Sequence, residues 1–237
     1  MNVLPQFSQP LTPLSCLFQL TALLLLLLPS PAGAPPNDDA WLLEDETDAV
    51  TPYDDTLALI HTPPPKDLYR LVNRLRISAD SLASGRVRVE QCHENLDPVP
   101  NLEIVYRPGR IDRIRIRSHS NIGRARVDGH SVQLQDIQRG ARLCLSLSKR
   151  MTEGAHEGEY HLRHGPFYRR FLDGYYPMRM SFRLDYPADR ATVSLINRGE
   201  IAGAGIRESA GKIEVDAHFA GKLTLTLQVS SDLVSDK

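Results

Sequence analysis

The sequence predicts an exported, mostly β protein whose folded part is an antiparallel two-sheet β-sandwich preceded by one short amphipathic helix. Three observations support this prediction. An apolar segment with a signal-peptide layout stands near the N-terminus, the chain beyond Gly85 alternates apolar and polar residues almost to its end, and two cysteines follow the apolar segment. Of the 237 residues, 41% are hydrophobic and 24% charged, a composition typical of globular proteins.

The N-terminal region divides into an export segment, residues 1–32, and an acidic, Pro-rich linker, residues 33–65. Leu14 to Leu28 reads LSCLFQLTALLLLLL and small residues follow, which is typical of a signal peptide. We expect cleavage after Ala32, which leaves a periplasmic or secreted protein. The alternative is an uncleaved inner-membrane anchor through residues 14–28, because the apolar stretch approaches the length that spans a bilayer. In both cases the folded part lies outside the cytoplasm.

The folded domain is expected over residues 66–237 and begins with a helix over residues 66–84. Thr62 would cap this helix, Pro63 would occupy its first turn and Gly85 would end it. Apolar residues at helical spacing would form one face: Leu68, Leu71, Val72, Leu75, Ala79 and Leu82.

Seven to nine short strands are expected after Gly85, because apolar residues then take every second position. The clearest segments are 86–92, 102–107, 113–117, 142–148, 178–185, 193–195, 213–219 and 223–229. The last two are expected to form a hairpin across Ala220-Gly221. Short antiparallel strands separated by Gly and Pro turns favour a two-sheet sandwich, with a barrel as the alternative.

The stretch VQLQDIQRGARLCLSL, residues 132–147, reads as a strand, a turn around Arg139-Gly140 and a second strand. Over about fifteen residues it resembles a corner connection of immunoglobulin-like and fibronectin-type sandwiches. The resemblance implies such an arrangement as one form of the predicted sandwich, and no other motif points to a particular family.

Two cysteines, Cys92 and Cys144, are expected to form a disulfide. Pairs of cysteines in exported chains usually do so, and both residues fall on the polar side of their predicted strands. A redox or metal-binding thiol pair is the alternative, although no C-x-x-C motif is present.

The folded part of the chain is basic. Every Lys and Arg lies at or beyond Lys66, while eight acidic residues fall between Asp38 and Asp55. Subtracting these eight from the 29 acidic residues leaves 21 against 28 basic residues, a balance of +7. Outward arginines of several strands would form one positive sheet face if those strands are neighbours, or else solvated strand surface: Arg86, Arg88, Arg113, Arg115, Arg117, Arg179 and Arg183.

The predicted ligand-binding site lies between residues 163 and 176, where aromatic and arginine side chains gather. Its members are Arg163, Phe167, Tyr168, Arg169, Arg170, Tyr175 and Tyr176. Aromatic faces stack on sugar rings and guanidinium groups bind carboxylates and phosphates. We therefore expect an anionic glycan, a lipid head group or an envelope protein as the partner, and no nucleic acid. The alternative is a hairpin whose aromatic side chains close the core.

A metal-binding protein or metal-dependent hydrolase centred on His156, His161 and His164 is the alternative function, because three imidazoles can ligate a metal ion. If this stretch is extended, however, His161 and His164 point to opposite faces. The sequence contains no G-x-S-x-G, H-E-x-x-H or phosphate-loop motif. A non-catalytic binding or accessory protein without a cofactor is therefore the main prediction.

Overall fold

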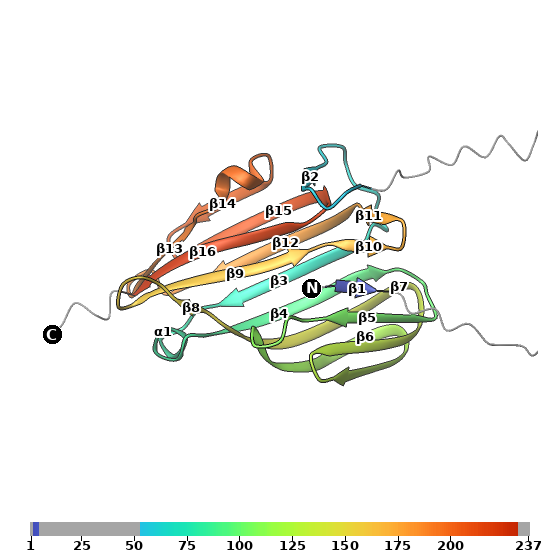
Figure 1. The fold of residues 1–237 in the computed structure, drawn as a ribbon, viewed down its shortest axis with the longest axis horizontal. Coiled ribbons are helices and arrows are strands. Elements are labelled where there is room, and N and C mark those ends of the chain that lie inside the picture. The colour runs from blue at the N-terminus through green and yellow to red at the C-terminus, as the bar shows by residue number, and fades with distance from the viewer. Residues whose placement is uncertain (1, 5–52, 232–237) are drawn as a thin grey trace, which may run out of the picture. The chain divides into compact units, whose positions relative to one another are not determined.

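A computed structural model describes residues 2–4 and 53–231 of the chain (Figure 1). Within these residues the protein is mostly β, with one short α-helix and one 3-10 helix, which confirms the predicted fold class. The strands are β1 (Asn2–Leu4), β2 (Ala58–Leu59), β3 (Arg70–Arg76), β4 (Arg86–Leu96), β5 (Asn101–Val105), β6 (Ile111–Asp128), β7 (Ser131–Arg150), β8 (Thr152–Glu153), β9 (Glu159–Phe167), β10 (Arg169–Phe171), β11 (Gly174–Tyr176), β12 (Met178–Asp185), β13 (Ala191–Leu195), β14 (Gly205–Ser209), β15 (Lys212–Ala220) and β16 (Leu223–Ser231). The helices are α1 (Ala79–Ser84) and the 3-10 helix η2 (Arg198–Ile201).

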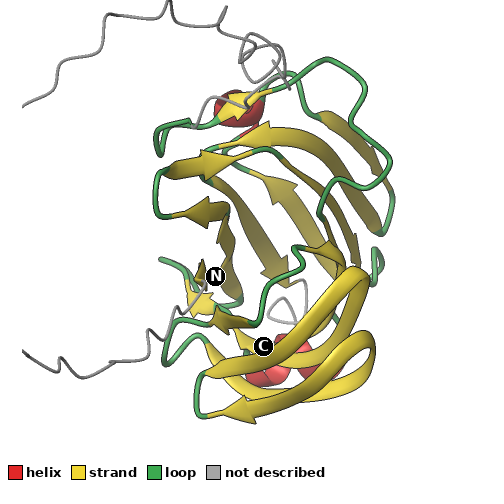
Figure 2. Cartoon of the chain, turned by 90° about the vertical axis from the view of Figure 1, so that its right-hand side faces the viewer, coloured by secondary structure: helices red, strands yellow, loops and turns green. Residues whose placement is uncertain are grey.

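The strands form a ten-stranded sheet, a four-stranded sheet and a small two-stranded ribbon. The large sheet has the order β1-β5-β7-β4-β3-β12-β15-β14, with β6 paired to β7 and β2 paired to β15. The four-stranded sheet has the order β13-β16-β9-β8, and β10 pairs with β11. The long strands of the large sheet bend together, so the sheet is curved rather than flat (Figure 2).

The core consists of inward side chains that take every second position along the strands of both sheets. In β12 the inward residues Met178, Met180, Phe182 and Leu184 are at most 2% exposed, and in β16 the four inward residues from Leu223 to Val229 are fully buried. This alternation follows from strand geometry, in which successive side chains point to opposite faces. The apolar positions that the sequence assigns to these strands are therefore the core positions.

The predicted helix over residues 66–84 is wrong in its first part. Residues 70–76 form β3, which lies between β4 and β12 and pairs in parallel with β12, and only Ala79–Ser84 is helical. The inward face of this strand includes Leu71, Asn73 and Leu75, all at most 1% exposed. Because the polar Asn73 interrupts the apolar alternation, the remaining apolar residues imitate helical spacing.

The predicted hairpin across Ala220-Gly221 is also wrong. β15 pairs with β12, β14 and β2, whereas β16 pairs with β13 and β9, so the turn carries the chain from one sheet to the other. Gly221 has a φ of +77°, and a Cβ there would lie 1.8 Å from the carbonyl oxygen of Thr56. Only glycine fits this conformation and this close approach.

Arg139-Gly140 is not a turn between two strands. Residues 131–150 form the continuous strand β7, which pairs with β5 through its first part and with β4 through its second. The register with β6 shifts at three places, including the step between Ser120 and Ile122, so local bulges bend the long strand. The corner connection predicted for residues 132–147 is therefore a bend within the single strand β7.

The end of the predicted linker packs on the large sheet. Ala58 and Leu59 form β2 opposite Ala220 and Phe219, and Tyr53 makes a two-way backbone bridge with Tyr175. Residues 5–52, which hold most of the predicted export segment and linker, lie outside the described residues. Among the residues that are described, no helix has the length and apolar character needed to cross a membrane.

Candidate functional site

The outer face of the large sheet carries a groove of about 640 Å³ lined by arginines. We name it the arginine groove, after its six lining arginines: Arg76, Arg86, Arg88, Arg113, Arg115 and Arg117. Serines also line it, including Ser146 and Ser148 of β7, while Asp80 and Glu90 are its acidic members. Five of the seven arginines that the sequence predicts for a positive face therefore meet in one groove, because β6 and β4 flank β7 on its two sides.

The strand registers place several of these side chains in one row across the sheet. Arg76 on β3 pairs with Arg88 on β4, Arg88 with Ser148 on β7, and Ser148 with Arg113 on β6. Side chains directly opposite on neighbouring strands lie about 5 Å apart at Cβ, and like charges in such positions are destabilising. The row within the groove thus holds three arginines and a serine. The acidic residue next in register is Asp185 on β12, beside Arg76, and its carboxylate pairs with Arg183.

Most of the positive charge in the arginine groove is uncompensated. Arg86 lies 3.4 Å from a carboxylate oxygen of Asp112. By contrast, Arg76, Arg88 and Arg113 make no side-chain hydrogen bond or ion pair with any residue that the structure describes. These three guanidinium groups are therefore available to bind an external anion.

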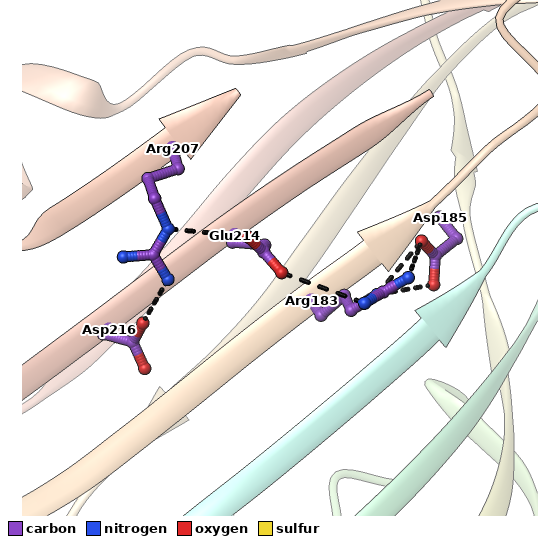
Figure 3. A network of polar contacts seen from close by, with 5 residues as sticks. All are labelled: Arg183, Asp185, Arg207, Glu214 and Asp216. Atoms are coloured by element: carbon purple, nitrogen blue, oxygen red, sulfur yellow. Dashed lines mark hydrogen bonds and ion pairs between the residues drawn. The ribbon is translucent and has the colours of Figure 1, made fainter. Parts of the chain in front are cut away.

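The two other arginines of the predicted face, Arg179 and Arg183, lie on β12 and do not line the groove. Arg183 donates two hydrogen bonds from Nε and one from Nη2 to Asp185, and Arg207 on β14 contacts Glu214 and Asp216 on β15 (Figure 3). The hydrogen bonds and charge of Asp185, with a smaller effect of Glu214, raise the pKa of Arg183 above its usual value. Arg183 and Arg207 are therefore charge-compensated by Asp185, Glu214 and Asp216, in contrast to Arg76, Arg88 and Arg113 of the groove.

The predicted aromatic and arginine site does not form one continuous binding surface. Phe167, Tyr168 and Tyr175 are less than 10% exposed, and the rings of Tyr168 and Tyr175 pack edge to face. Tyr176 is partly exposed, and its hydroxyl donates to Asp173. Arg170 lies over the ring of Tyr175. Most of these aromatic side chains therefore close the core around β10 and β11, as the alternative interpretation expects.

Arg169 is held by contacts within the protein. Its Nη2 and Nε atoms donate to the two carboxylate oxygens of Asp97 at 2.6 and 3.0 Å, and its guanidinium group lies over the rings of Phe171 and Tyr176. Nη1 donates to the carbonyl oxygen of Pro177. This bidentate pair fixes the β10–β11 ribbon to the end of β4 and leaves little of the guanidinium group for a ligand.

The three histidines of the alternative metal centre do not converge. His161 and His164 lie on opposite faces of β9, since His161 is partly exposed beside Glu159 and His164 is 4% exposed in the interior. His156 lies in the exposed turn before β9. Over the described residues, no group of three His, Cys, Asp or Glu side chains is arranged to hold a metal ion.

The predicted disulfide between Cys92 and Cys144 is confirmed. The two residues are direct partners in the β4–β7 register, with their Cα atoms 4.1 Å apart. Both point to the outer face of the sheet, as their positions in the alternation predict. A disulfide in this position is typical of proteins that fold outside the reducing cytoplasm.

Between the two sheets lies a cavity of about 350 Å³, which we name the interior cavity. β4 and β7 contribute Val89, Gln91, Leu147 and Lys149, and β9 contributes residues 163–167. The connection between β5 and β6 closes one side with Tyr106, Arg107 and Arg110. Arg163 and Phe167, two of the seven predicted ligand-binding residues, therefore line this cavity.

Polar side chains form an ordered wall of the interior cavity. The hydroxyl of Tyr106 donates to Oε1 of Gln91 at 2.7 Å, and Nε2 of Gln91 donates to Oδ1 of Asn73 at the same distance. Burial raises the pKa of Tyr106 well above its usual value, so this hydroxyl stays protonated. A chain of this kind fixes the rotamers of the groups that face the cavity.

Lys149 and His164 are the buried basic groups of the cavity wall. Both are at most 6% exposed. Burial, reinforced by Arg110 and Arg163, lowers the pKa of Lys149 to about 8. Burial also lowers the pKa of His164 well below its usual value, so its ring is neutral near pH 7.

Lys149 and Gln91 were not among the residues predicted from the sequence, and His164 was predicted only as a member of the alternative metal centre, although a signal for each of the three as a cavity residue is present. Lys149 continues the inward series Leu143, Leu145, Leu147 of β7, and Gln91 continues the series Val87, Val89 of β4. Polar residues that occupy inward positions of alternating strands are candidates for a functional interior. The same rule identifies His164, two positions after the buried Leu162.

Comparison with known proteins gives no family. No family model matches the chain, and no curated protein matches it. Among solved structures, the chain is similar to the M1 zinc metallopeptidase from Deinococcus radiodurans, at 12% identity and a TM-score of 0.36. The complex of a mutant of that enzyme with a Tyr-Ser-Ala substrate gives 12% identity and a TM-score of 0.38. In both cases the match covers 69% of this chain and 42% of the other, so the chain spans less than half of that protein's length. A likeness at this level supports no conclusion on function.

Proposed function

We propose that the protein is a non-catalytic binding protein of the cell envelope, and that it recognises an anionic glycan or other polyanion through the arginine groove. The observation that carries this proposal is the row Arg76, Arg88, Ser148 and Arg113, in which three arginines face solvent without an acidic partner. Guanidinium groups form paired hydrogen bonds with carboxylate, phosphate and sulfate groups, and the serine hydroxyl between them can donate another.

The place in the envelope is supported by the Cys92–Cys144 disulfide and by the predicted export segment. The groove extends over side chains of β3, β4, β7 and β6. A polymer with repeated negative charges suits such a shape, because successive anionic groups would contact successive rows of the sheet.

The proposal is tested by binding to heparin, a sulfated polysaccharide that serves as the probe polyanion. We expect the double variant Arg88→Glu/Arg115→Glu to lose at least tenfold in affinity, and the binding of the unaltered protein to weaken as NaCl is raised. Arg124→Glu/Arg139→Glu makes the same charge change at exposed positions outside the groove and is the matched control. Equal losses in the two double variants would show that net charge, and not the groove, determines binding.

A further inference from the structure

The interior cavity is a second place where positive charge lacks a partner. Four cationic side chains line it, Arg107, Arg110, Lys149 and Arg163, and its lining contains no Asp or Glu. None of the four makes a side-chain hydrogen bond or ion pair within the described parts of the chain, 2–4 and 53–231. Arg110 and Arg163 both repel the charge on Lys149. A site that collects like charges without a counter-ion is complementary to an anion.

Unsatisfied hydrogen-bonding groups point into the same region. His164 is 4% exposed, and neither Nδ1 nor Nε2 has a hydrogen-bond partner. The side chain of Lys149, which is 6% exposed, makes no hydrogen bond or ion pair with the described residues either. Buried polar groups in native proteins are almost always hydrogen-bonded, because leaving one unpaired costs free energy. The neutral imidazole supplies one donor and one acceptor, and the ammonium group supplies three donors.

The rest of the lining is apolar. Val89, Val105, Ile111, Leu147 and Phe167 contribute aliphatic and aromatic surface to the cavity. A small inorganic anion would leave this surface without a partner, whereas a molecule with an apolar body would cover it. The volume of about 350 Å³ lies within the usual range of small-molecule sites.

We propose that the interior cavity binds a small organic carboxylate with an apolar body. The carboxylate lies against Lys149 and His164, while Arg107, Arg110 and Arg163, which are more exposed, attract it at the mouth. The apolar body lies along Leu147, Val89 and Phe167. This site is separate from the arginine groove, and the proposal does not depend on polyanion binding there.

The test uses octanoate as the probe and octanamide, its neutral counterpart, as the ligand control. Isothermal titration calorimetry and the shift in melting temperature are measured on the purified, disulfide-bonded protein. We expect octanoate to bind and to raise the melting temperature, and octanamide to bind at least tenfold more weakly. Equal binding of the two ligands, or no binding of octanoate, would overturn the proposal.

Variants assign the binding to the cavity. Lys149→Met keeps the length of the side chain and removes the charge from a residue that is 6% exposed, so it is expected to fold. The affinity for octanoate should fall at least tenfold. Lys212→Met, which lies outside the cavity, is the matched control and should bind as the unaltered protein does. Should Lys149→Met fail to fold, Arg163→Met at the exposed mouth gives the same test with a severalfold loss. Full affinity for octanoate in a folded variant at either position would overturn the assignment. Arg88→Glu/Arg115→Glu, which changes only the arginine groove, is expected to bind octanoate with unchanged affinity.

Discussion

Arg76 and Arg88 lie directly opposite each other on the neighbouring antiparallel strands β3 and β4, and neither exposed guanidinium group makes an ion pair with a residue that the structure describes. A sheet selected for stability alone would place opposite charges at such a pair. On β14 and β15 this is the case, since Arg207 lies opposite Glu214. Like-charge neighbours also occur outside the groove, at Arg70 and Arg179 and at Arg74 and Arg183, where carboxylates lie within ion-pair distance of Arg70 and Arg183.

Replacing one member of the like-charge pair should increase the stability of the protein and weaken its binding of heparin. We expect Arg76→Gln to raise the free energy of unfolding by about 0.5 kcal/mol, because it removes the repulsion from Arg88. The same change should weaken heparin binding severalfold. Urea unfolding and a heparin titration measure the two effects, and Arg124→Gln on β6 is the control. A loss of stability without a loss of binding would contradict the assignment.

Removing the disulfide should destabilise the protein without changing its fold. The bond joins residues 52 positions apart, and the chain-entropy model gives a stabilisation of about 4 kcal/mol for a loop of this size. We expect Cys92→Ser/Cys144→Ser to lower the free energy of unfolding by about this amount, as measured by urea unfolding. The unaltered protein in reductant should lose a similar amount, while the variant should not respond to reductant. A reductant effect on the variant would show that another thiol or bond contributes.

The buried ammonium group of Lys149 should make stability depend on pH. Its pKa is about 8 in the folded protein against 10.5 for an ordinary lysine, so between these values the unfolded chain binds more protons than the folded one. The free energy of unfolding should therefore rise with pH across this window, by on the order of 3 kcal/mol in total. Arg107, Arg110 and Arg163 are the other cationic side chains that line the interior cavity. His164 stays neutral because its pKa is lowered, and Tyr106 stays neutral because its pKa is raised.

The measurement is the difference in unfolding free energy between the unaltered protein and Lys149→Met from pH 7 to pH 11. Other titrating groups cancel in this difference. We expect the variant to be the more stable of the two at pH 7, with the advantage shrinking as pH rises. A difference that is constant over this range would mean that Lys149 titrates normally.

Arg169 should act in stability and not in ligand binding. Its side chain is 18% exposed and that of Asp97 is 23% exposed, and they form a bidentate pair. Arg169→Ala leaves the carboxylate of Asp97 without its donor, so a loss of about 2 kcal/mol is expected in thermal or urea unfolding. Arg170→Ala, at the exposed neighbouring position, should change stability by less than half of that. Heparin binding should be unchanged in Arg169→Ala. A large loss of heparin affinity in this variant would show that Arg169 contributes to ligand binding.

Some features of the protein follow from the sequence alone. The two-residue alternation predicts the strands and their buried faces, and the parity of Cys92 and Cys144 predicts that both lie on the outer face. The same parity places Arg88 and Arg113 on that face. These predictions succeed because strand geometry is local, so the face on which a side chain lies depends only on its position along its own strand.

Other features were decided only by the tertiary structure. Asn73 is buried because Gln91 on the next strand satisfies part of its amide, and this long-range contact turns an apparent helix into β3. The chain after Ala220 crosses to the second sheet because β9 and β13, distant in sequence, are the partners of β16. The arginine groove and the interior cavity likewise depend on which strands become neighbours. Strand order is set by the burial of both sheet faces together, and no local pattern contains that information.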